Sequence, residues 1–208
     1  MVKSADTLCV DGAGASGAMK PELDHWVVAI GASGGQGLGD IQVLLGALRY
    51  PWAAAVLVVL HRPADKVSNL RHILARSSPM PVVIAAEGEA LRPGVCYIGE
   101  PDAHLTLLAG NLAHLTDGML RNRTVDVLFQ SLARAAAPRI IGVVLSGSLD
   151  DGSRGLAEIH HAGGLTMVLT PDRAKGGQMP ANAIDYDGPI DFIGSATQIA
   201  GEIDRLTA

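Results

Sequence analysis

The chain contains the stretch WVVAIGASGGQGLGDIQVLL at residues 26–45. Its first five residues are a continuous apolar run, which is typical of a buried β-strand. A glycine-rich turn follows over residues 31–35, and the apolar residues of 41–45 then recur at helical spacing. The stretch therefore predicts a strand, a tight turn and a helix in succession.

The same alternation continues along the rest of the chain. Residues 105–108 and 112–115 flank a turn and predict a hairpin, and the helix that follows begins at Thr124, a residue type that caps helices. The sequence thus predicts an α/β fold with a doubly wound, mostly parallel sheet, helices on both faces and an antiparallel hairpin. Further strands are predicted at 54–60, 81–85, 95–98, 140–145 and 165–169, further helices at 65–76, 124–137, 153–162 and 195–207, and a loop around Gly176, Gly177 and Pro180.

Length and local composition predict one folded domain with a tail. At 208 residues the chain fits a single domain with one substantial core. Residues 1–24 are rich in glycine, alanine and serine and lack periodicity, so we expect a flexible N-terminal leader or linker there. Residues 25–208 are then expected to form one catalytic domain.

Composition argues against several classes of protein. A formal net charge of −5 and the lack of a basic stripe argue against a nucleic-acid binder. Cys9 and Cys96 are too few and too far apart for a disulfide framework or a zinc cage, and the histidines lack the spacing of metal ligands. The sequence has neither a signal peptide nor an apolar run of 18 residues. We therefore expect a cytoplasmic protein without membrane insertion or bound metal.

Nucleotide binding is the weaker alternative for the glycine-rich segments. Residues 12–17 match the pattern G-x-G-x-x-G, but Pro21 follows closely and no predicted strand and helix flank them. The turn at 31–35 could cradle a phosphate. However, the second strand ends in His61, where a ribose-binding Asp or Glu would be expected.

Three chemically complementary groups follow three of the predicted strands. Ser33 follows the first strand, His61 follows the second, and the adjacent Asp150 and Asp151 lie in the loop after residues 140–145. Because the carboxyl ends of parallel strands meet at one edge of a sheet, we expect these side chains to converge. Sequence spacing alone does not separate the two adjacent carboxylates.

A serine, a histidine and a carboxylate at one edge predict nucleophilic catalysis. The imidazole activates the serine hydroxyl by taking its proton, and the carboxylate orients the imidazole and stabilises its charged form. Residues 31–35 also match G-x-S-x-G, although the order Ser-His-Asp differs from that of α/β-hydrolases. The amides of Gly34 and Gly35 are candidate oxyanion donors, with a further donor near Ser148. The predicted activity is hydrolysis of an ester or amide.

Each of the three residues also has an ordinary structural explanation. Ser33 could cap the following helix, His61 could face solvent, and Asp151 could be a turn residue before glycine. The coincidence of three such residues at three strand ends favours the catalytic interpretation.

Over about residues 26–205 the sequence resembles the catalytic domain of the chemotaxis protein-glutamate methylesterase family, CheB. The motifs that carry this resemblance occur in the family's order. They are Ile30-Gly31-Ala32-Ser33, His61 with Pro63, Glu87-Gly88, Pro93-Gly94, Tyr97, Pro101, His104, Val125-Asp126-Val127-Leu128-Phe129, Gly142-Val143-Val144-Leu145-Ser146-Gly147, Asp151-Gly152 and Met179-Pro180.

The resemblance implies specific roles and a specific reaction. It makes Ser33 the nucleophile, His61 the base and Asp151 the acid, because the family's acid is the aspartate directly followed by glycine, and it adds Met179 to the substrate-binding residues. It implies hydrolysis of glutamate γ-methyl esters on the cytoplasmic domain of methyl-accepting chemoreceptors, deamidation of receptor glutamines by the same acyl-enzyme route, and no cofactor.

The resemblance also raises the question of regulation. Most members of the family carry an N-terminal receiver domain, and residues 1–24 are too short to form one. Either the chain is a stand-alone form controlled by a separate regulatory protein, or it is the catalytic part of a longer one.

Several positions depart from the family pattern near the predicted site. They are Gly34-Gly35-Gln36 for Thr-Gly-Gly, Ser148 for methionine, Gln178 for glycine and Asn122-Arg123-Thr124 for Arg-Pro-Ser. The three predicted triad residues are retained. The alternative is therefore a catalytically weak relative that serves as a binding or regulatory module.

Overall fold

The computed structural model describes residues 25–61, 69–101, 103–117, 123–135, 139–172, 178–186 and 188–208. The leader expected at 1–24 lies outside the described residues, as do Cys9 and the start of the helix expected at 65–76. The elements are β1 (Trp26–Ser33), α1 (Gly34–Ala47), β2 (Ala54–His61), α2 (Leu70–Ala75), β3 (Val82–Ile84), β4 (Cys96–Ile98), β5 (Ala103–Leu108), β6 (Leu112–Asp117), α3 (Thr124–Ala135), β7 (Ile140–Val144), α4 (Ser153–His161), β8 (Leu165–Leu169), α5 (Gln178–Asp185), β9 (Phe192–Gly194) and α6 (Ala196–Thr207).

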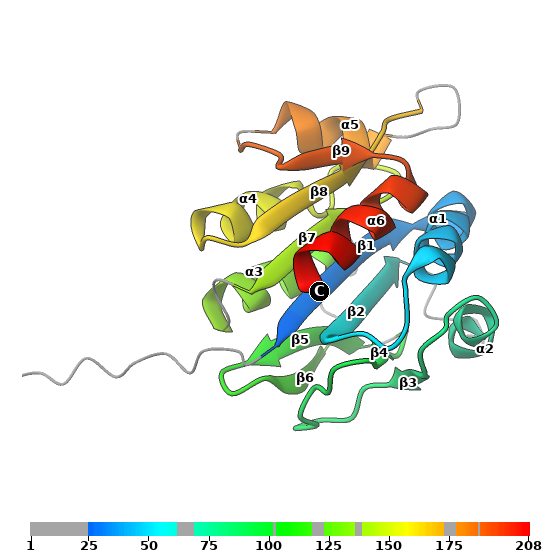
Figure 1. Ribbon diagram of the computed structural model, residues 1–208. Helices are drawn as coiled ribbons and strands as arrows, with labels where there is room; N and C mark the ends of the chain where they lie inside the picture. Colours follow the sequence, from blue (N-terminus) through cyan, green and yellow to red (C-terminus); the bar gives the residue numbers. More distant parts are fainter. Residues whose placement is uncertain are drawn as a thin grey trace, which may run out of the picture.

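A seven-stranded parallel sheet forms the centre of the molecule (Figure 1). Its strand order is β3-β4-β2-β1-β7-β8-β9, so β1 has β2 on one side and β7 on the other. The chain first builds the β2 side and then returns beside β1 to build the β7 side. The direction of winding therefore reverses between β1 and β7. In sheets of this kind, ligands bind beyond the carboxyl ends of the strands at that point.

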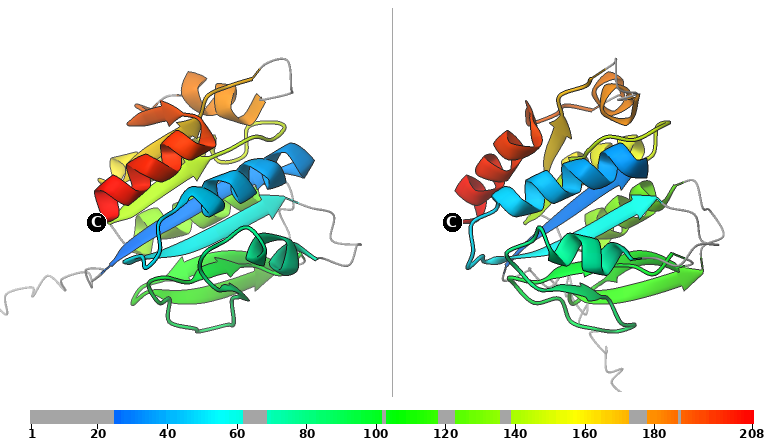
Figure 2. Two further views of the ribbon diagram at one scale, coloured as in Figure 1. Left: turned by 45° about the vertical axis from the view of Figure 1, so that its right-hand side comes forward. Right: turned by 90° about the vertical axis from the view of Figure 1, so that its right-hand side faces the viewer.

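Two layers cover the sheet, and Figure 2 shows α1 and α6 lying against one of its faces. On that face α1, α2 and α6 bury apolar side chains together with Ile30 and Val56. On the opposite face α3, α4, α5 and the β5–β6 hairpin pack with Ala29 and Leu57. Successive residues of β1 and β2 alternate between the two cores, because strand side chains point to opposite faces in turn. Among the described helices, none is long and apolar enough to cross a bilayer.

The antiparallel hairpin β5–β6 lies beside α3. Its Leu107 is buried, and the Leu107 amide donates a hydrogen bond of 3.0 Å to Oγ of Ser131 on α3. The outer edge of β6 is covered by the preceding segment, where the amide of Gly88 donates to the carbonyl of Ala113 at 2.8 Å. The hairpin thus completes the layer on the α3 face and leaves little of that strand edge unpaired.

The structure confirms the predicted fold class and corrects three details. Strand β1 continues through the glycine turn to Ser33 and β2 continues to His61, so both residues end strands rather than follow them. Pro180, expected in a loop, lies in the first turn of α5, where an amide would have no helical partner in any case. The edge strand β9 is not predicted, because it contains only two apolar residues, Phe192 and Ile193, between Asp191 and Gly194.

The contact between β1 and α3 depends on Gly31. A side chain at this position would overlap Val125 in the first turn of α3. We expect Gly31→Ala to lower the free energy of unfolding by about 1–3 kcal/mol, because the helix must move to admit the methyl group.

Gly39→Ala is the matched control, because a side chain at Gly39 would meet nothing within 4 Å. Alanine in the α1 interior should leave the free energy of unfolding unchanged or raise it by up to about 1 kcal/mol. Urea denaturation of both variants measures the difference. Equal stability of the two variants would contradict the close packing of α3 on β1.

Candidate active site

Ser33 and His61 end two adjacent parallel strands and are paired in register. Residues paired in this way point to the same face of the sheet. Ala32 and Leu60, one residue earlier, belong to the core beneath α1, so Ser33 and His61 point to the face that α3 covers. The structure therefore brings these two predicted residues together at the carboxyl edge of the sheet.

Ser33 occupies the N-cap position of α1 but makes no side-chain cap hydrogen bond there. Its backbone is extended, and Gly34 follows in the left-handed region with φ of +70°. By contrast, Ser195 at the start of α6 accepts a hydrogen bond from the amide of Gln198 within a capping box. The helix-cap explanation of Ser33 is therefore wrong, because within the described part of the chain its hydroxyl does not cap α1.

Gly147, just after β7, packs directly against Ser33. The amide of Ser33 donates to the carbonyl of Ser146 at 2.9 Å, which extends the pairing of β1 with the β7 segment. A side chain at Gly147 would overlap the sulfur of Met179 and approach Cβ of Ser33 to 2.8 Å. Ser33 and Met179 thus border the same small space. Met179 is fully buried, and its predicted contact with substrate stays a prediction.

The predicted oxyanion donors lie at the start of α1 and beyond Gly147. Gly34 and Gly35 are exposed, and a side chain at either would meet nothing within 4 Å. Amides in the first turn of a helix lack intrahelical partners and carry the positive end of the helix dipole. Ser148 is exposed in the loop that leads to the acid. This geometry suits anion stabilisation at α1, and the individual roles stay predictions.

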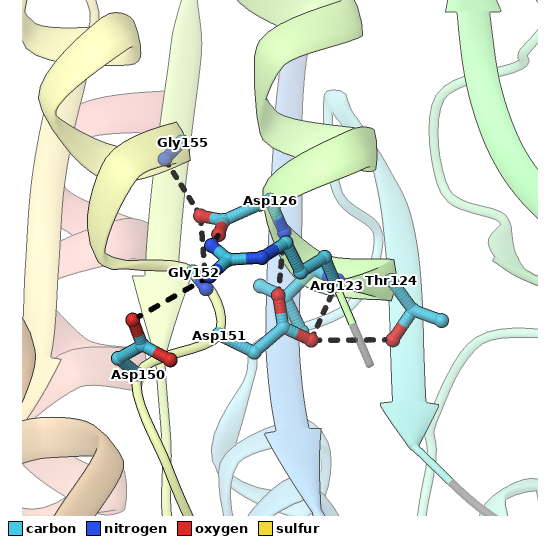
Figure 3. A network of polar contacts seen from close by, with 8 residues as sticks. Arg123, Thr124, Asp126, Asp150, Asp151, Gly152 and Gly155 are labelled. Carbon is cyan, nitrogen blue, oxygen red and sulfur yellow. Dashed lines mark hydrogen bonds and ion pairs between the residues drawn. The ribbon is translucent and has the colours of Figure 1, made fainter. Parts of the chain in front are cut away.

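Asp151 is buried against the first turn of α3 (Figure 3). Its Oδ1 accepts from the amide of Asp126 at 2.9 Å, and its Oδ2 accepts from the amide of Val125 at 3.1 Å and from the hydroxyl of Thr124 at 3.4 Å. Thr124, expected to cap this helix, instead donates its hydroxyl to Asp151, which supplies a cap from a distant loop.

Burial raises the pKa of the Asp151 carboxyl above its usual value, and the nearby charge of Asp126 acts in the same direction. The hydrogen bonds from Asp126, Val125 and Thr124 favour the ionised form and offset part of that rise. These hydrogen bonds thus stabilise the ionised form of Asp151, whereas its burial away from water disfavours that form.

Asp126 caps α4 in return. Its Oδ1 accepts from the amides of Gly152 at 3.0 Å and Gly155 at 2.8 Å, at the start of α4. Each helix therefore receives its cap from a carboxylate carried by the other helix or by its leading loop (Figure 3). We call this arrangement, made by Asp126 and Asp151, the reciprocal cap.

Asp150 lies in a different environment from Asp151. Its side chain is 54% exposed and forms an ion pair with Arg123, with Nη2 at 3.9 Å from Oδ2. Arg123 also contacts Asp126, with Nη1 at 3.3 Å from Oδ2. The two aspartates that the sequence spacing leaves unresolved are thus one buried and one exposed, which favours Asp151 as the residue that faces the interior of the site.

Within the described residues, no hydrogen bond joins His61 to Ser33 or Asp151. Catalytic hydrogen bonds are often long in the unliganded state and tighten when substrate binds. A hydroxyl, an imidazole and a buried carboxylate at one edge of the sheet are the groups that serine-based acyl transfer requires.

The sequence assigns no role to Asp126. It leaves Arg123 open between a solvated charge and a contact with an acidic protein surface, whereas the structure pairs it with Asp126. Asp126 belongs to a motif that supports the family resemblance, but nothing local indicates that its carboxylate reaches α4. The available signal is weak. It consists of an acidic residue in the first turn of a predicted helix, where carboxylates are favoured by the helix dipole in any case.

Comparisons with known proteins point to one family. The family model described as CheB methylesterase matches residues 28–203. A protein from Yersinia pestis named protein-glutamate methylesterase/protein-glutamine glutaminase is 35% identical over 173 residues, which cover 80% of this chain and 49% of the relative. A protein of Chromobacterium violaceum with the same name, numbered 1, is 35% identical over 191 residues, covering 89% and 52%.

A solved structure extends the likeness to the fold. The crystal structure of the Thermotoga maritima CheB methylesterase catalytic domain superposes with a TM-score of 0.80 at 27% identity, covering 88% of this chain and all of that one. The chain spans about half the length of the curated relatives that it matches.

The burial of Asp151 predicts a definite pH dependence of stability. Because its pKa in the folded chain lies above the usual 3.8, the folded chain holds this proton more tightly than the unfolded chain does. As the pH rises from 3.8 through the raised pKa, the free energy of unfolding of the wild type should therefore fall relative to that of Asp151→Asn. Urea titrations across this window measure the difference, and a relative gain by the wild type would contradict the account.

Proposed function

The chain belongs to the CheB methylesterase family, and from that premise we propose that it is a serine hydrolase that cleaves glutamate γ-methyl esters in proteins. The proposed nucleophile is Ser33, the general base His61 and the acid Asp151. The same route deamidates glutamine side chains, because an amide nitrogen can replace the ester oxygen as the leaving group.

The proposed reaction proceeds through an acyl-enzyme. Oγ of Ser33 forms a bond to the γ-carbonyl carbon while His61 takes the hydroxyl proton. The tetrahedral intermediate then breaks its bond to the methoxy oxygen, which leaves as methanol with the proton from His61. Water then attacks the acyl carbon while His61 takes its proton. The bond from that carbon to Oγ of Ser33 breaks, His61 returns the proton to Oγ, and the product leaves as glutamate after its acid proton passes to solvent. Amides at the start of α1 stabilise the oxyanion in both steps.

The main support for the proposal is the position and hydrogen bonding of Ser33. It is paired in register with His61, it points to the face on which Asp151 is buried, and its hydroxyl makes no helix-cap hydrogen bond. A serine that merely connected β1 to α1 would be expected to cap the helix, as Ser195 does at the start of α6.

The proposed substrate is a methylated glutamate on the cytoplasmic domain of a chemoreceptor, and the proposed location is the cytoplasm. The exposure of Gly34 and Gly35 supports this choice, because a side chain presented on a protein surface must reach the start of α1. The proposed chemistry needs no cofactor, since every proton passes between side chains, substrate and water. Control of the activity comes from a separate regulatory protein or from outside the domain.

Two serines at equivalent strand-to-helix junctions provide a matched test. Ser33→Ala should lower kcat for methanol release from methylated receptor by at least about a thousandfold, because it removes the nucleophile. Its free energy of unfolding should change little, since the hydroxyl makes no cap hydrogen bond.

Ser195→Ala should show the opposite pattern. Loss of its cap should lower the free energy of unfolding by about 1 kcal/mol and leave kcat within twofold of the wild type. Methanol release and urea denaturation of both variants measure the four quantities. Wild-type turnover in Ser33→Ala would rule out this nucleophile.

The binding-module alternative makes a different prediction for chemical reactivity. An activated serine should react rapidly with a fluorophosphonate, and mass spectrometry should locate the adduct on Ser33. A chain that binds methylated receptor but leaves Ser33 unlabelled would favour the binding or regulatory module.

A further inference from the structure

Asp126 contacts the loop that carries Asp151, which we call the acid loop, at two points. Its backbone amide donates to Oδ1 of Asp151, and its carboxylate accepts from the amide of Gly152, the next residue along the chain. A third bond, from the amide of Gly155 at 2.8 Å, ties the same oxygen of Asp126 to the first turn of α4. Asp126 is 3% exposed, so these bonds are shielded from water.

The hydrogen bonds of Asp151 leave one direction for a further donor. A carboxylate offers about four acceptor positions, two on each oxygen. Oδ2 uses both of its positions, for the hydroxyl of Thr124 and the amide of Val125. Oδ1 uses one, for the amide of Asp126. Among the described residues, the unused position therefore lies on Oδ1, and the amide of Asp126 determines which way it points.

The carboxylate of Asp126 fixes the backbone beside the acid. Gly152 has φ of +96°, and a side chain there would come within 2.8 Å of Val125 and 3.1 Å of Val144. The loop therefore turns sharply after Asp151 and packs closely on α3 and β7, with its amide bound to Asp126. Loss of the carboxylate would leave two buried amides at the start of α4 unpaired and free this turn to move.

Arg123 offsets the negative charge that Asp126 places close to Asp151. Two like charges close together disfavour ionisation, and the charge of Asp126 does raise the pKa of Asp151. The guanidinium of Arg123 lies 3.3 Å from Oδ2 of Asp126, on the oxygen that does not cap α4. Asp126 thus serves as an acceptor for α4 while Arg123 offsets its charge.

We propose that Asp126 is a positioning residue for the acid of the active site, holding Asp151 so that the unused acceptor of Oδ1 is directed toward His61. Asp126 touches no reacting atom and acts through Asp151. The inference rests on the proposed function, because it gives Asp151 the task of orienting His61.

Two substitutions of Asp126 separate its acceptor from its charge. Asp126→Ala removes the acceptor and should lower kcat for methanol release by about 10- to 100-fold with little change in KM, because it displaces a catalytic group. Asp126→Asn keeps an oxygen that can accept both amides of α4, and it should retain kcat to within about fivefold. Equal losses in the two variants would contradict positioning through this acceptor.

Asp191→Ala is the matched control at the far edge of the sheet. Asp191 accepts from the amide of Thr166 at 2.8 Å and from its hydroxyl at 2.9 Å, where β8 begins. Its loss should lower the thermal midpoint without lowering kcat more than twofold. A comparable fall in kcat for Asp191→Ala would mean that kcat merely follows stability.

A double-mutant cycle tests whether Asp126 acts through Asp151. In the Asp151→Asn background, Asp126→Ala should lower the remaining kcat less than twofold, because the acid that it positions is already lost. An unchanged 10- to 100-fold loss in that background would overturn the proposal. If Asp126→Ala does not fold, Asp126→Ser, whose hydroxyl is too short to reach both amides, takes its place in each comparison.

The rate of Ser33 labelling by a fluorophosphonate separates this inference from the proposed function. A wild type that labels but releases no methanol would overturn the methylesterase assignment, and slower labelling of Asp126→Ala would still support positioning. A wild type that neither labels nor releases methanol would overturn both. A wild type that does both while Asp126→Ala matches it would overturn the positioning role alone.

Discussion

The pairing of β1 with its two neighbours is the constraint on which the site depends. Because the side chains of a strand alternate between faces, a slip of one residue between β1 and β2 would place Ser33 and His61 on opposite sides of the sheet. The observed register pairs them directly. On the other side of β1, the amide of Ser33 bonds to the carbonyl of Ser146, which fixes the start of the loop that carries Asp151. One strand therefore aligns all three elements of the proposed site.

The reciprocal cap adds the second level of organisation. A carboxylate at a helix N-terminus is favoured by the free amides and by the helix dipole, and such caps contribute about 0.5–2 kcal/mol each. Here Asp151 and Asp126 cap α3 and α4, so the bonds that stabilise the helix pair also hold the acid loop. Stability and site geometry are thus coupled through the same few atoms. This coupling accounts for the burial of the carboxylates of Asp126 and Asp151 between α3 and α4, whose packed faces are otherwise apolar.

Sequence reasoning succeeds where the signal is local and repeated. The apolar runs of the central strands predict the parallel sheet, and the rule that strand ends converge predicts that Ser33 and His61 meet. The strand β9 escapes prediction because Phe192 and Ile193 are an isolated apolar pair, and the helical position of Pro180 escapes it because glycine and proline at 176–180 are typical of a loop. The choice between Asp150 and Asp151 comes from the family resemblance, and the structure adds that one is exposed and the other buried.

The reciprocal cap is beyond sequence reasoning for a different reason. Asp126 and Gly152 are far apart in the chain, and their bond exists only because α3 and α4 pack side by side. Thr124 illustrates the same limit. Its residue type predicts a local helix cap, but a carboxylate from a distant loop takes that position and the hydroxyl becomes a donor.

The central claim is that Ser33, His61 and Asp151 act as one catalytic unit. A crystal structure of the chain after reaction with a fluorophosphonate tests it most directly, because the adduct resembles the tetrahedral intermediate. The account predicts a covalent bond between phosphorus and Oγ of Ser33, and one ring nitrogen of His61 within about 3.2 Å of that oxygen. It also predicts that the other ring nitrogen donates a hydrogen bond to Oδ1 of Asp151. An adduct on another residue, or an imidazole turned away from both partners, would contradict it.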